Sequence, residues 1–302
     1  MSNLRLPEKL DLLGEADVCV IGGGLAGLSA ALAGSAAGCK TALIEERGAL
    51  AWEIPHGLEI FLERNPSAGL LADLTRTLAA QNAFRGQTLD PVAVELACDT
   101  LAKAAGVRLH FRMHAAHVDL AAGVACLATK SGPVSFKAQS FVDATESARV
   151  ARNAGAKFAA PHAEPQVERA ALLCAVQAPA ESFTLAVPGL EEVHVRPTLW
   201  ANEAHLRIRV RAESESQTRF ALAKAIEALR ARPGFEKASL ALSSHEGFAL
   251  SVPKLDPHSL PENLAVAGPA VLGRKPSLEE RVELGLKAAT LLTSHLRAVA
   301  AK

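Results

Sequence analysis

The 302-residue chain contains no tyrosine, and aromatic residues make up only 4% of it. Tyrosine is therefore excluded as a catalytic acid or base. The chain also lacks an excess of charge of either sign, because 32 Lys and Arg residues balance 32 Asp and Glu residues. This balance gives no electrostatic reason to expect nucleic acid or a membrane surface as a partner. A net charge of zero gives little electrostatic repulsion between molecules, so the sequence does not exclude a homo-oligomer or a partner subunit.

Cysteine is sparse, and its spacing excludes several chemistries. The cysteines are Cys19, Cys39, Cys98, Cys126 and Cys174. Their number is odd and no two form a C-x-x-C pair, which argues against a redox dithiol and a cysteine-rich zinc site. The histidines show no metal-ligand spacing, so we expect no metal. Reduced cysteines, the absence of a signal peptide and a glycine-interrupted apolar stretch at residues 18–37 favour a cytoplasmic protein.

What the sequence does contain is a glycine-rich turn between a strand and a helix. Residues 18–21 are all apolar, as in a strand buried on both faces, and Gly22-Gly23-Gly24-Leu25-Ala26-Gly27 follows. An alanine-rich helix is expected over residues 26–38, and a second buried strand over 41–44 ends at Glu45. The order strand, glycine turn, helix, strand and acid is typical of dinucleotide binding.

Three glycines and the acid of this pattern each have a physical role. Gly22 allows the tight turn, Gly24 lets the backbone approach a pyrophosphate, and Gly27 lets the helix pack closely on the strand. The free N–H groups at the helix start attract phosphate. Glu45 is placed to accept hydrogen bonds from the ribose hydroxyls, and its charge disfavours the 2′-phosphate of NADP. The alternative is a glycine turn that only joins packed elements.

The choice between FAD and NAD depends on a resemblance. Residues 17–31, closed by Leu43-Ile44-Glu45, resemble the start of FAD-dependent oxidoreductases among the glutathione-reductase-type flavoproteins, which are two-domain Rossmann proteins. Residues 140–145 resemble the family strand that passes the cofactor, although Glu146 stands where glycine is expected. Residues 262–268, followed by a loop and a long helix, resemble the second FAD segment, although Pro269 replaces an acidic or small polar residue.

The resemblance implies FAD as the cofactor. The residues that it implies for FAD binding are Gly22, Gly24, Leu25, Ala26, Gly27, Glu45, Glu46, Arg47, Val118, Ala144, Thr145, Gly268 and Arg281. An NAD-dependent dehydrogenase is the main competitor, but it would not need the terminal strand, glycine and helix. No second G-x-G-x-x-G occurs, so a separate NAD(P)H domain is not expected.

The predicted fold class is α/β with two domains. Residues 1–158 and 253–302 are expected to form a discontinuous Rossmann-type FAD-binding domain with a parallel central sheet. After a linker at 160–168, strand-like runs at 172–176, 182–187, 192–195, 205–211 and 238–243 and a helix at 217–232 predict a smaller α+β domain at 159–252, with an antiparallel sheet. The resemblance implies that this domain covers the flavin and sets the substrate.

The strand expected at residues 205–211 alternates strictly. Leu206, Ile208 and Val210 would face the core, and Arg207, Arg209 and Arg211 would face outward. The arginines form either a solvated face of the sheet or a surface that recognises a carboxylate, a phosphate or an acidic partner.

Two residues are candidates for chemistry. His56 follows the ribose-binding strand, titrates near neutrality and could act as a general base oriented by Glu53, unless it only caps a turn beside Pro55. Arg274, with Lys275 beside it, could stabilise negative charge on the reduced flavin, unless this loop is only surface. The pattern Ser277-Leu278-Glu279-Glu280 is a capping box that starts the last helix.

These features predict an FAD-dependent oxidoreductase that passes a hydride from a small organic substrate to flavin N5 and then to an acceptor that the sequence does not identify. The altered positions Glu146 and Pro269 and the small second domain keep an alternative open, a non-catalytic FAD-holding subunit or assembly factor of a larger enzyme. A lesser alternative is an NAD-dependent dehydrogenase.

Overall fold

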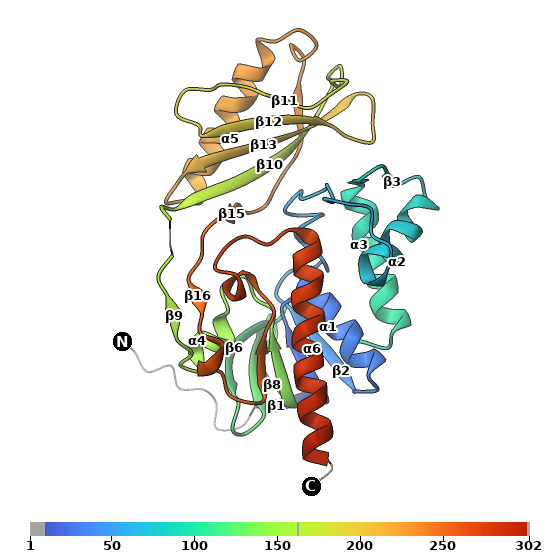
Figure 1. The fold of residues 1–302 in the computed structure, drawn as a ribbon, viewed down its shortest axis with the longest axis vertical. Helices are drawn as coiled ribbons and strands as arrows, with labels where there is room; N and C mark the ends of the chain where they lie inside the picture. Colours follow the sequence, from blue (N-terminus) through green and yellow to red (C-terminus); the bar gives the residue numbers. More distant parts are fainter. Residues whose placement is uncertain (1–9, 162, 301–302) are drawn as a thin grey trace.

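The computed structural model describes residues 10–161 and 163–300. The chain is built around two sheets that lie one above the other in Figure 1. The lower sheet is formed by strands from both ends of the chain, and the upper sheet by residues between them. No helix in the described part of the chain is long and apolar enough to cross a membrane.

The lower sheet has seven strands in the order β5-β2-β1-β8-β7-β6, with β17 also paired to β8. Their bounds are β1 Asp11–Ile21, β2 Thr41–Glu45, β5 Arg108–Phe111, β6 His114–Asp119, β7 Val124–Thr129, β8 Gly132–Asp143 and β17 Leu264–Val266. Strands β5, β2, β1, β8 and β17 are parallel, and β7 and β6 add an antiparallel edge. This arrangement confirms the predicted α/β class with a parallel central sheet.

Both faces of this sheet are covered. On one face lie α1 Leu25–Ala36, α2 Gly69–Ala79, α3 Pro91–Ala104 and α6 Leu278–Ala300, which bury Val20 and Leu43. On the other face α4 Arg149–Asn153 and the β6–β8 strands enclose Cys19 and Ile44. Helix α6 runs along α1 (Figure 1), and a Cβ at Gly285 would overlap the carbonyl of Ala26, so glycine permits their close approach. The last helix is thereby held against the helix that starts at the glycine turn.

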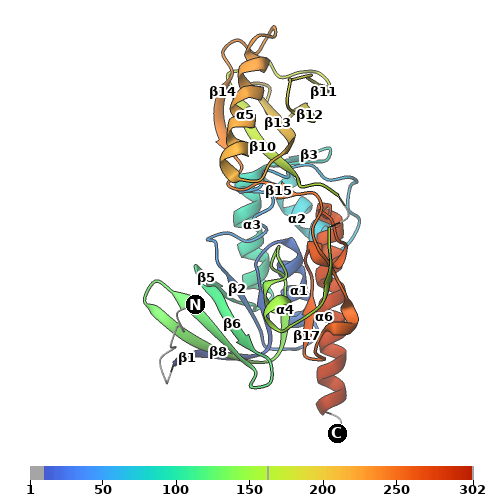
Figure 2. The same cartoon turned by 90° about the vertical axis from the view of Figure 1, so that its left-hand side faces the viewer.

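The upper sheet is antiparallel throughout and has six strands in the order β11-β12-β13-β10-β14, with β15 beside β10. The bounds are β10 Gln166–Cys174, β11 Phe183–Thr184, β12 Glu192–Pro197, β13 Glu203–Arg211, β14 Ser239–Ser243 and β15 Phe248–Ala249. Helix α5 Glu215–Arg230 lies on the sheet face away from the lower domain (Figure 2) and starts at a capping box of Ser214 and Gln217. Leu206 and Ile208 are fully buried in this layer, as the alternation predicts.

The chain crosses between the two layers near residues 158–166 and 249–254, where β9 Phe158–Ala159 pairs with β16 Lys254–Leu255. The domain boundaries predicted after residues 158 and 252 fall in these crossings. The division of the chain into two domains stays a prediction. The linker expected at residues 160–168 ends early, because β10 begins at Gln166. No element is predicted at residues 69–79, where the structure has α2. The remaining short elements are β3 Phe84–Arg85, β4 Thr88–Leu89, η1 Pro257–Ser259 and η2 Pro269–Val271.

Candidate cofactor and substrate site

The glycine turn lies at the carboxyl ends of β1 and β8. These strands are paired in register, with Ile21 beside Asp143, so the turn that follows Ile21 lies against Ala144. Gly22 has φ +105°, and a Cβ there would lie 2.6 Å from the Ala144 carbonyl oxygen. A Cβ at Gly27 would overlap the carbonyl oxygen of Gly22. Side chains are therefore excluded at both positions, as the predicted tight turn and close helix packing require.

A cavity of about 190 Å³ opens beside this turn. Its lining includes six of the predicted cofactor residues, namely Gly22, Glu45, Glu46, Arg47, Ala144 and Thr145. Gly268 lies next to them, because a Cβ there would come within 2.6 Å of the Thr145 carbonyl oxygen. The structure thus brings together residues from the first, second and last segments of the predicted site.

Val118 is an exception, and its predicted place in the cofactor site is corrected here. It lies on a different hollow, together with His117, and the cavity beside the glycine turn is lined instead by Met113 and Ala115. The pairing of β6 with β7 shifts register between Ala115 and His117, so the two ends of β6 present different residues to the cavity. Sequence alternation alone does not reveal such a shift.

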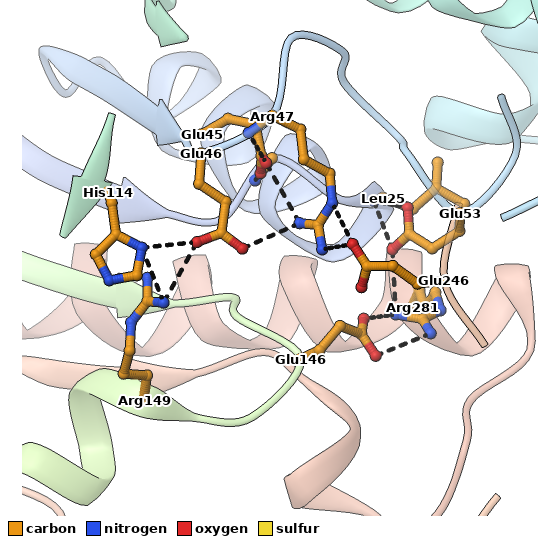
Figure 3. Close-up of polar contacts among 11 residues, drawn as sticks. Leu25, Glu45, Glu46, Arg47, Glu53, His114, Glu146, Arg149, Glu246 and Arg281 are labelled. Atoms are coloured by element: carbon orange, nitrogen blue, oxygen red, sulfur yellow. Dashed lines mark hydrogen bonds and ion pairs between the residues drawn. The ribbon is translucent and has the colours of Figure 1, made fainter. Parts of the chain in front are cut away.

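Charged side chains surround the cavity in a continuous series (Figure 3). Glu45 is buried and accepts hydrogen bonds from the backbone N–H groups of Gly23 and of Arg47, the latter at 2.6 Å. The Arg47 guanidinium pairs with Glu246 at 2.6 Å and lies 4.2 Å above the Trp52 ring. This end of the site presents a fixed carboxylate, a cation and an aromatic ring.

Glu46 continues the series on the outer side. It contacts His114 at 3.0 Å and Arg149 at 3.3 Å. Burial opposes ionisation, but the His114 hydrogen bond and the charges of Arg149 and Arg47 hold the pKa of Glu46 below its ordinary value. Glu46 is therefore ionised at neutral pH and fixes the neighbouring cations.

The opposite end of the site is filled by a second group, the ion cluster of Glu53, Arg281 and Glu146 (Figure 3). The Glu53 carboxylate accepts the Leu25 N–H at 3.0 and 3.1 Å, at the start of α1. It pairs with Arg281 at 3.1 Å, and Arg281 also pairs with Glu146. Glu53 is 1% exposed and Arg281 3%.

The protonation of the ion cluster follows from its burial and its charges. Burial raises the pKa of Glu53, and the neighbouring Glu146 adds to this effect. Burial alone would lower the pKa of Arg281, but the carboxylates of Glu146 and Glu53 raise it further above its ordinary value. Arg281 is therefore always charged, and its charge keeps the Glu53 carboxylate in place.

The residues present fit the adenosine end of an FAD molecule, whereas the Glu53 carboxylate lies at the position expected for the diphosphate. The 190 Å³ cavity, with Glu45 and Arg47, offers the polar groups that an adenosine end requires. The start of α1 is where a dinucleotide diphosphate docks, but the Glu53 carboxylate lies there, and a Cβ at Gly24 would overlap its Oε1. FAD therefore fits this site once Glu53 has left the Leu25 N–H.

One part of the role predicted for His56, its orientation by Glu53, differs from the structure. Its ring stacks on His245 with the centroids 4.3 Å apart, and Glu53 contacts Leu25 and Arg281 instead of orienting it. Burial and the neighbouring His245 lower the pKa of His56. The large cavity between the two layers is lined by other histidines. The expectation that Glu53 orients His56 is corrected, and the role of His56 as a general base stays a prediction.

That larger cavity has a volume of about 570 Å³ and lies between the loop at residues 58–63, the start of α6 and the lower face of the upper sheet. Arg274 lines it, but its guanidinium pairs with Glu280 at 2.6 Å and is 53% exposed, and its contact with the flavin stays a prediction. Lys275 contacts Glu59 at 2.5 Å and Glu168 at 2.6 Å. These cations are already neutralised by the chain.

The capping box predicted for the last helix is confirmed. The Glu280 N–H donates to the Ser277 hydroxyl at 3.2 Å, and the Ser277 N–H donates to Glu280 at 2.9 Å. Glu279 serves a different purpose, because its carboxylate accepts the N–H groups of Glu63 at 2.8 Å and Arg64 at 3.3 Å. The start of α6 is thereby tied to the loop that lines the larger cavity.

Arg196 differs from the other cations of the cavity. Its guanidinium lies 3.6 Å from the centroid of the Phe61 ring, and no described carboxylate lies within ion-pair distance. Burial and the neighbouring charge of Arg207 lower the pKa of Arg196. By contrast, Arg207 and Arg209 both lie within reach of Glu168 and Glu192. Arg196 is thus a cation in the cavity with no counter-ion from the described chain.

Two histidines share this face of the sheet. His205 Nε2 lies 3.0 Å from the Leu58 carbonyl oxygen, and Nδ1 has no partner among the described residues. Burial lowers the pKa of His205 to about 3, and His194, also in the lining, has its pKa lowered by burial and Arg207. Arg196, His194 and His205 were not predicted as site residues, although His205 lies two positions before Arg207 and therefore on the same face of β13.

The comparisons with known proteins agree on the fold. The pattern of the FAD dependent oxidoreductase family matches residues 17–267. No curated protein matches the chain. Within the described part of the chain, no three metal-ligating side chains lie close enough to hold a metal ion.

Many solved structures are similar in fold. A geranylgeranyl bacteriochlorophyll reductase-like protein from Thermoplasma acidophilum has a TM-score of 0.69 at 16% identity, over 95% of this chain and 80% of the other. The p-nitrophenol 4-monooxygenase of Pseudomonas putida has a TM-score of 0.65 at 15% identity, over 95% and 80%. Aklavinone-11 hydroxylase, in a complex with FAD and aklavinone, has a TM-score of 0.60 at 16% identity, over 93% and 63%.

Proposed function

The chain belongs to the FAD-dependent oxidoreductase family, and we propose that it oxidises a small anionic organic substrate bound in the 570 Å³ cavity between its two layers. As a member of this family it is an enzyme that uses FAD. The observation that carries the proposal is the position of that cavity, which lies between the start of α6 and the sheet of the upper layer. The relationship to glutathione-reductase-type flavoproteins and a cytoplasmic location, which the free cysteines favour, are part of the same proposal.

This chain's residues would hold FAD in two groups. Glu45 and Arg47 would hold the adenosine end, and the N–H groups at the start of α1, with Arg281, would hold the diphosphate after Glu53 has moved. When bound, FAD supplies the hydride acceptor, N5 of its flavin ring. The protein contributes binding, orientation and the exclusion of water.

Arg196 supports an anionic substrate. A cation that is half buried and lacks a carboxylate from the chain gains most from an anion that enters with the ligand. The Phe61 ring beneath the guanidinium holds it in one orientation. A carboxylate on the substrate would therefore bind Arg196 and fix the rest of the substrate in the cavity.

The histidines of the cavity contribute in their neutral form. His205 donates from Nε2 to the Leu58 carbonyl, which leaves the Nδ1 lone pair free. Because its pKa is about 3, His205 adds no positive charge at neutral pH, and it holds the loop at residue 58 to the sheet. His194, which is less buried, is the better proton acceptor for the substrate.

A second candidate function is favoured by the ion cluster. In this candidate the cluster only holds the bound cofactor, and the chain serves as an FAD-holding, non-catalytic subunit or assembly factor of a larger enzyme. Glu146, which replaces the glycine of the family pattern, is the partner of Arg281 in that cluster and supports this candidate.

An anaerobic reduction experiment separates the two. The protein is saturated with FAD, and the visible flavin absorption is followed while amines, hydroxy acids and nicotinamides are added one class at a time. The enzyme proposal expects bleaching by an acidic member of the first two classes, and loss of that bleaching in an Arg196→Gln variant. Bleaching by nicotinamides alone would assign the electrons to another donor, and no bleaching by any class would favour the non-catalytic role.

A further inference from the structure

We infer that Glu53 is an internal competitor for the dinucleotide diphosphate, and that Arg281 exchanges Glu53 for the diphosphate when the cofactor binds. The inference rests on the proposed function in one respect, that the glycine turn is the dinucleotide site. It adds that the chain carries its own anion at the diphosphate position and must release it. It also identifies a role for Glu146, one of the departures from the family pattern.

The first argument is the place of the Glu53 carboxylate. The start of a helix attracts anions through its free N–H groups and its partial positive charge. Glu53 accepts the Leu25 N–H with both oxygens, at 3.0 and 3.1 Å, and its Oε1 fills the space beside Gly24 that the family pattern leaves open for a phosphate. A diphosphate oxygen and this carboxylate cannot both accept the hydrogen bond of the Leu25 N–H.

The second argument is the counter-ion. Arg281 lies between Glu53 and Glu146, so its single positive charge faces two carboxylates. When Glu53 leaves, Arg281 keeps Glu146 as a partner and still has donors for a phosphate, because a guanidinium carries five N–H groups. The exchange therefore keeps the buried Arg281 charge paired.

The third argument is that the polar contacts of Glu45 and Arg47 do not include Glu53. The side chains of Glu45 and Arg47 bond to Gly23, Glu46, Glu246 and each other, and neither bonds to Glu53. The Trp52 ring, under the Arg47 guanidinium, stacks on Phe248 with the centroids 5.3 Å apart. A ligand that has only the adenosine end should therefore not depend on Glu53, whereas a ligand with a diphosphate should.

The experiment compares adenosine, ADP and FAD as ligands of the full-length wild type and of Glu53→Ala, with Kd values from calorimetry and from flavin fluorescence. We expect Glu53→Ala to lower the Kd values of ADP and FAD by about tenfold or more, the ratio that corresponds to ~1.4 kcal/mol, and to leave the Kd of adenosine unchanged. Glu53→Gln, which keeps the volume and removes the charge, should tighten them less. Asp73→Ala, which removes an exposed carboxylate from α2, serves as the control and should change none of the three.

The inference is overturned if Glu53→Ala raises the affinity for adenosine as much as that for ADP, or if it raises the affinity for neither ADP nor FAD. It is also overturned if Asp73→Ala raises these affinities as much as Glu53→Ala does. A Glu53→Ala/Arg281→Met double variant should lose the gain for ADP. If it keeps that gain, Arg281 has no part in the exchange and this half of the inference is wrong. None of these readouts requires a substrate, so their failure is distinct from a failure of flavin reduction.

Discussion

The Glu53 carboxylate and the Arg281 guanidinium lie 3.1 Å apart inside the protein, although 228 positions separate them in the chain. One comes from the loop after β2 and the other from the first turns of α6. Their pairing joins the glycine turn to the last helix at the proposed diphosphate position.

Removal of Arg281 should destabilise the protein strongly. In an Arg281→Met variant the Glu53 carboxylate stays buried without its cation, a change that typically costs about 3–5 kcal/mol. We expect a decrease of this size in the free energy of unfolding measured with urea. Glu53→Gln combined with Arg281→Met should recover part of the loss, because no buried charge is then left unpaired at that position.

Arg274→Met is the matched control for that variant. Its ion pair with Glu280 is 53% exposed on the arginine side, and exposed pairs contribute about 1 kcal/mol or less. Equal losses for the variants at Arg281 and Arg274 would show that the internal cluster is not the stabilising element that we describe.

Two glycines of α1 should respond differently to alanine. At Gly27 a Cβ would overlap a backbone carbonyl, that of Gly22, and the backbone cannot move without disturbing the turn. We expect Gly27→Ala to cost about 3 kcal/mol or more. At Gly34 the nearest atom is the Thr41 hydroxyl at 3.0 Å, and alanine favours the helix, so Gly34→Ala should change stability by about 1 kcal/mol or less. Thermal and urea unfolding of both variants check this contrast.

His205 should make the fold sensitive to acid. Its pKa falls from 6.5 in the unfolded chain to about 3 in the fold, so the unfolded chain binds a proton that the folded chain does not. The contribution of neutral His205 to the free energy of unfolding is complete above about pH 6.5 and is lost as pH falls toward 3. Between about pH 7.5 and pH 5, we expect wild type to lose about 2 kcal/mol that His205→Gln does not lose. The exposed His258→Gln should behave as wild type, and an equal pH response in all three would contradict the assignment.

Arg196 should select ligands by charge. A panel of small carboxylates, each with its neutral amide, is added to the protein and the shift in unfolding temperature is measured. We expect larger shifts from carboxylates, and we expect Arg196→Gln to remove the difference. Arg211→Gln is the control, because Arg211 lies on the same sheet but pairs with Glu164 and Glu191. Equal shifts from acids and amides in wild type would argue against an anionic substrate.

The parts of the fold that depend on local pattern could be predicted from the sequence. The apolar run before Gly22, the glycines and Glu45 specify a strand, a turn and a second strand by short-range rules, and the structure has them in that order. The alternation of Leu206 and Ile208 fixes the buried face of β13 in the same way. The predicted start of β10, at residue 172, is late because Gln166, Glu168 and Arg169 are polar, although Glu168 and Arg169 are buried.

The ion cluster could not be predicted, because it depends on tertiary packing. Glu53 was read as an orienting group for His56, its neighbour in sequence, but the start of α1 and Arg281 attract it more strongly. Glu146 was recognised only as a departure from a glycine. Val118 was misplaced by a register shift in β6, and Arg196 was missed because an isolated arginine on a short strand carries no signal of its own.

The most direct test of the account is the visible absorption spectrum of FAD titrated with the wild-type protein and with Glu53→Ala. The account predicts that both proteins perturb the flavin bands in a saturable way, and that the variant saturates at a lower protein concentration. Spectra that remain the simple sum of free FAD and protein, for the wild type and the variant alike, would contradict it.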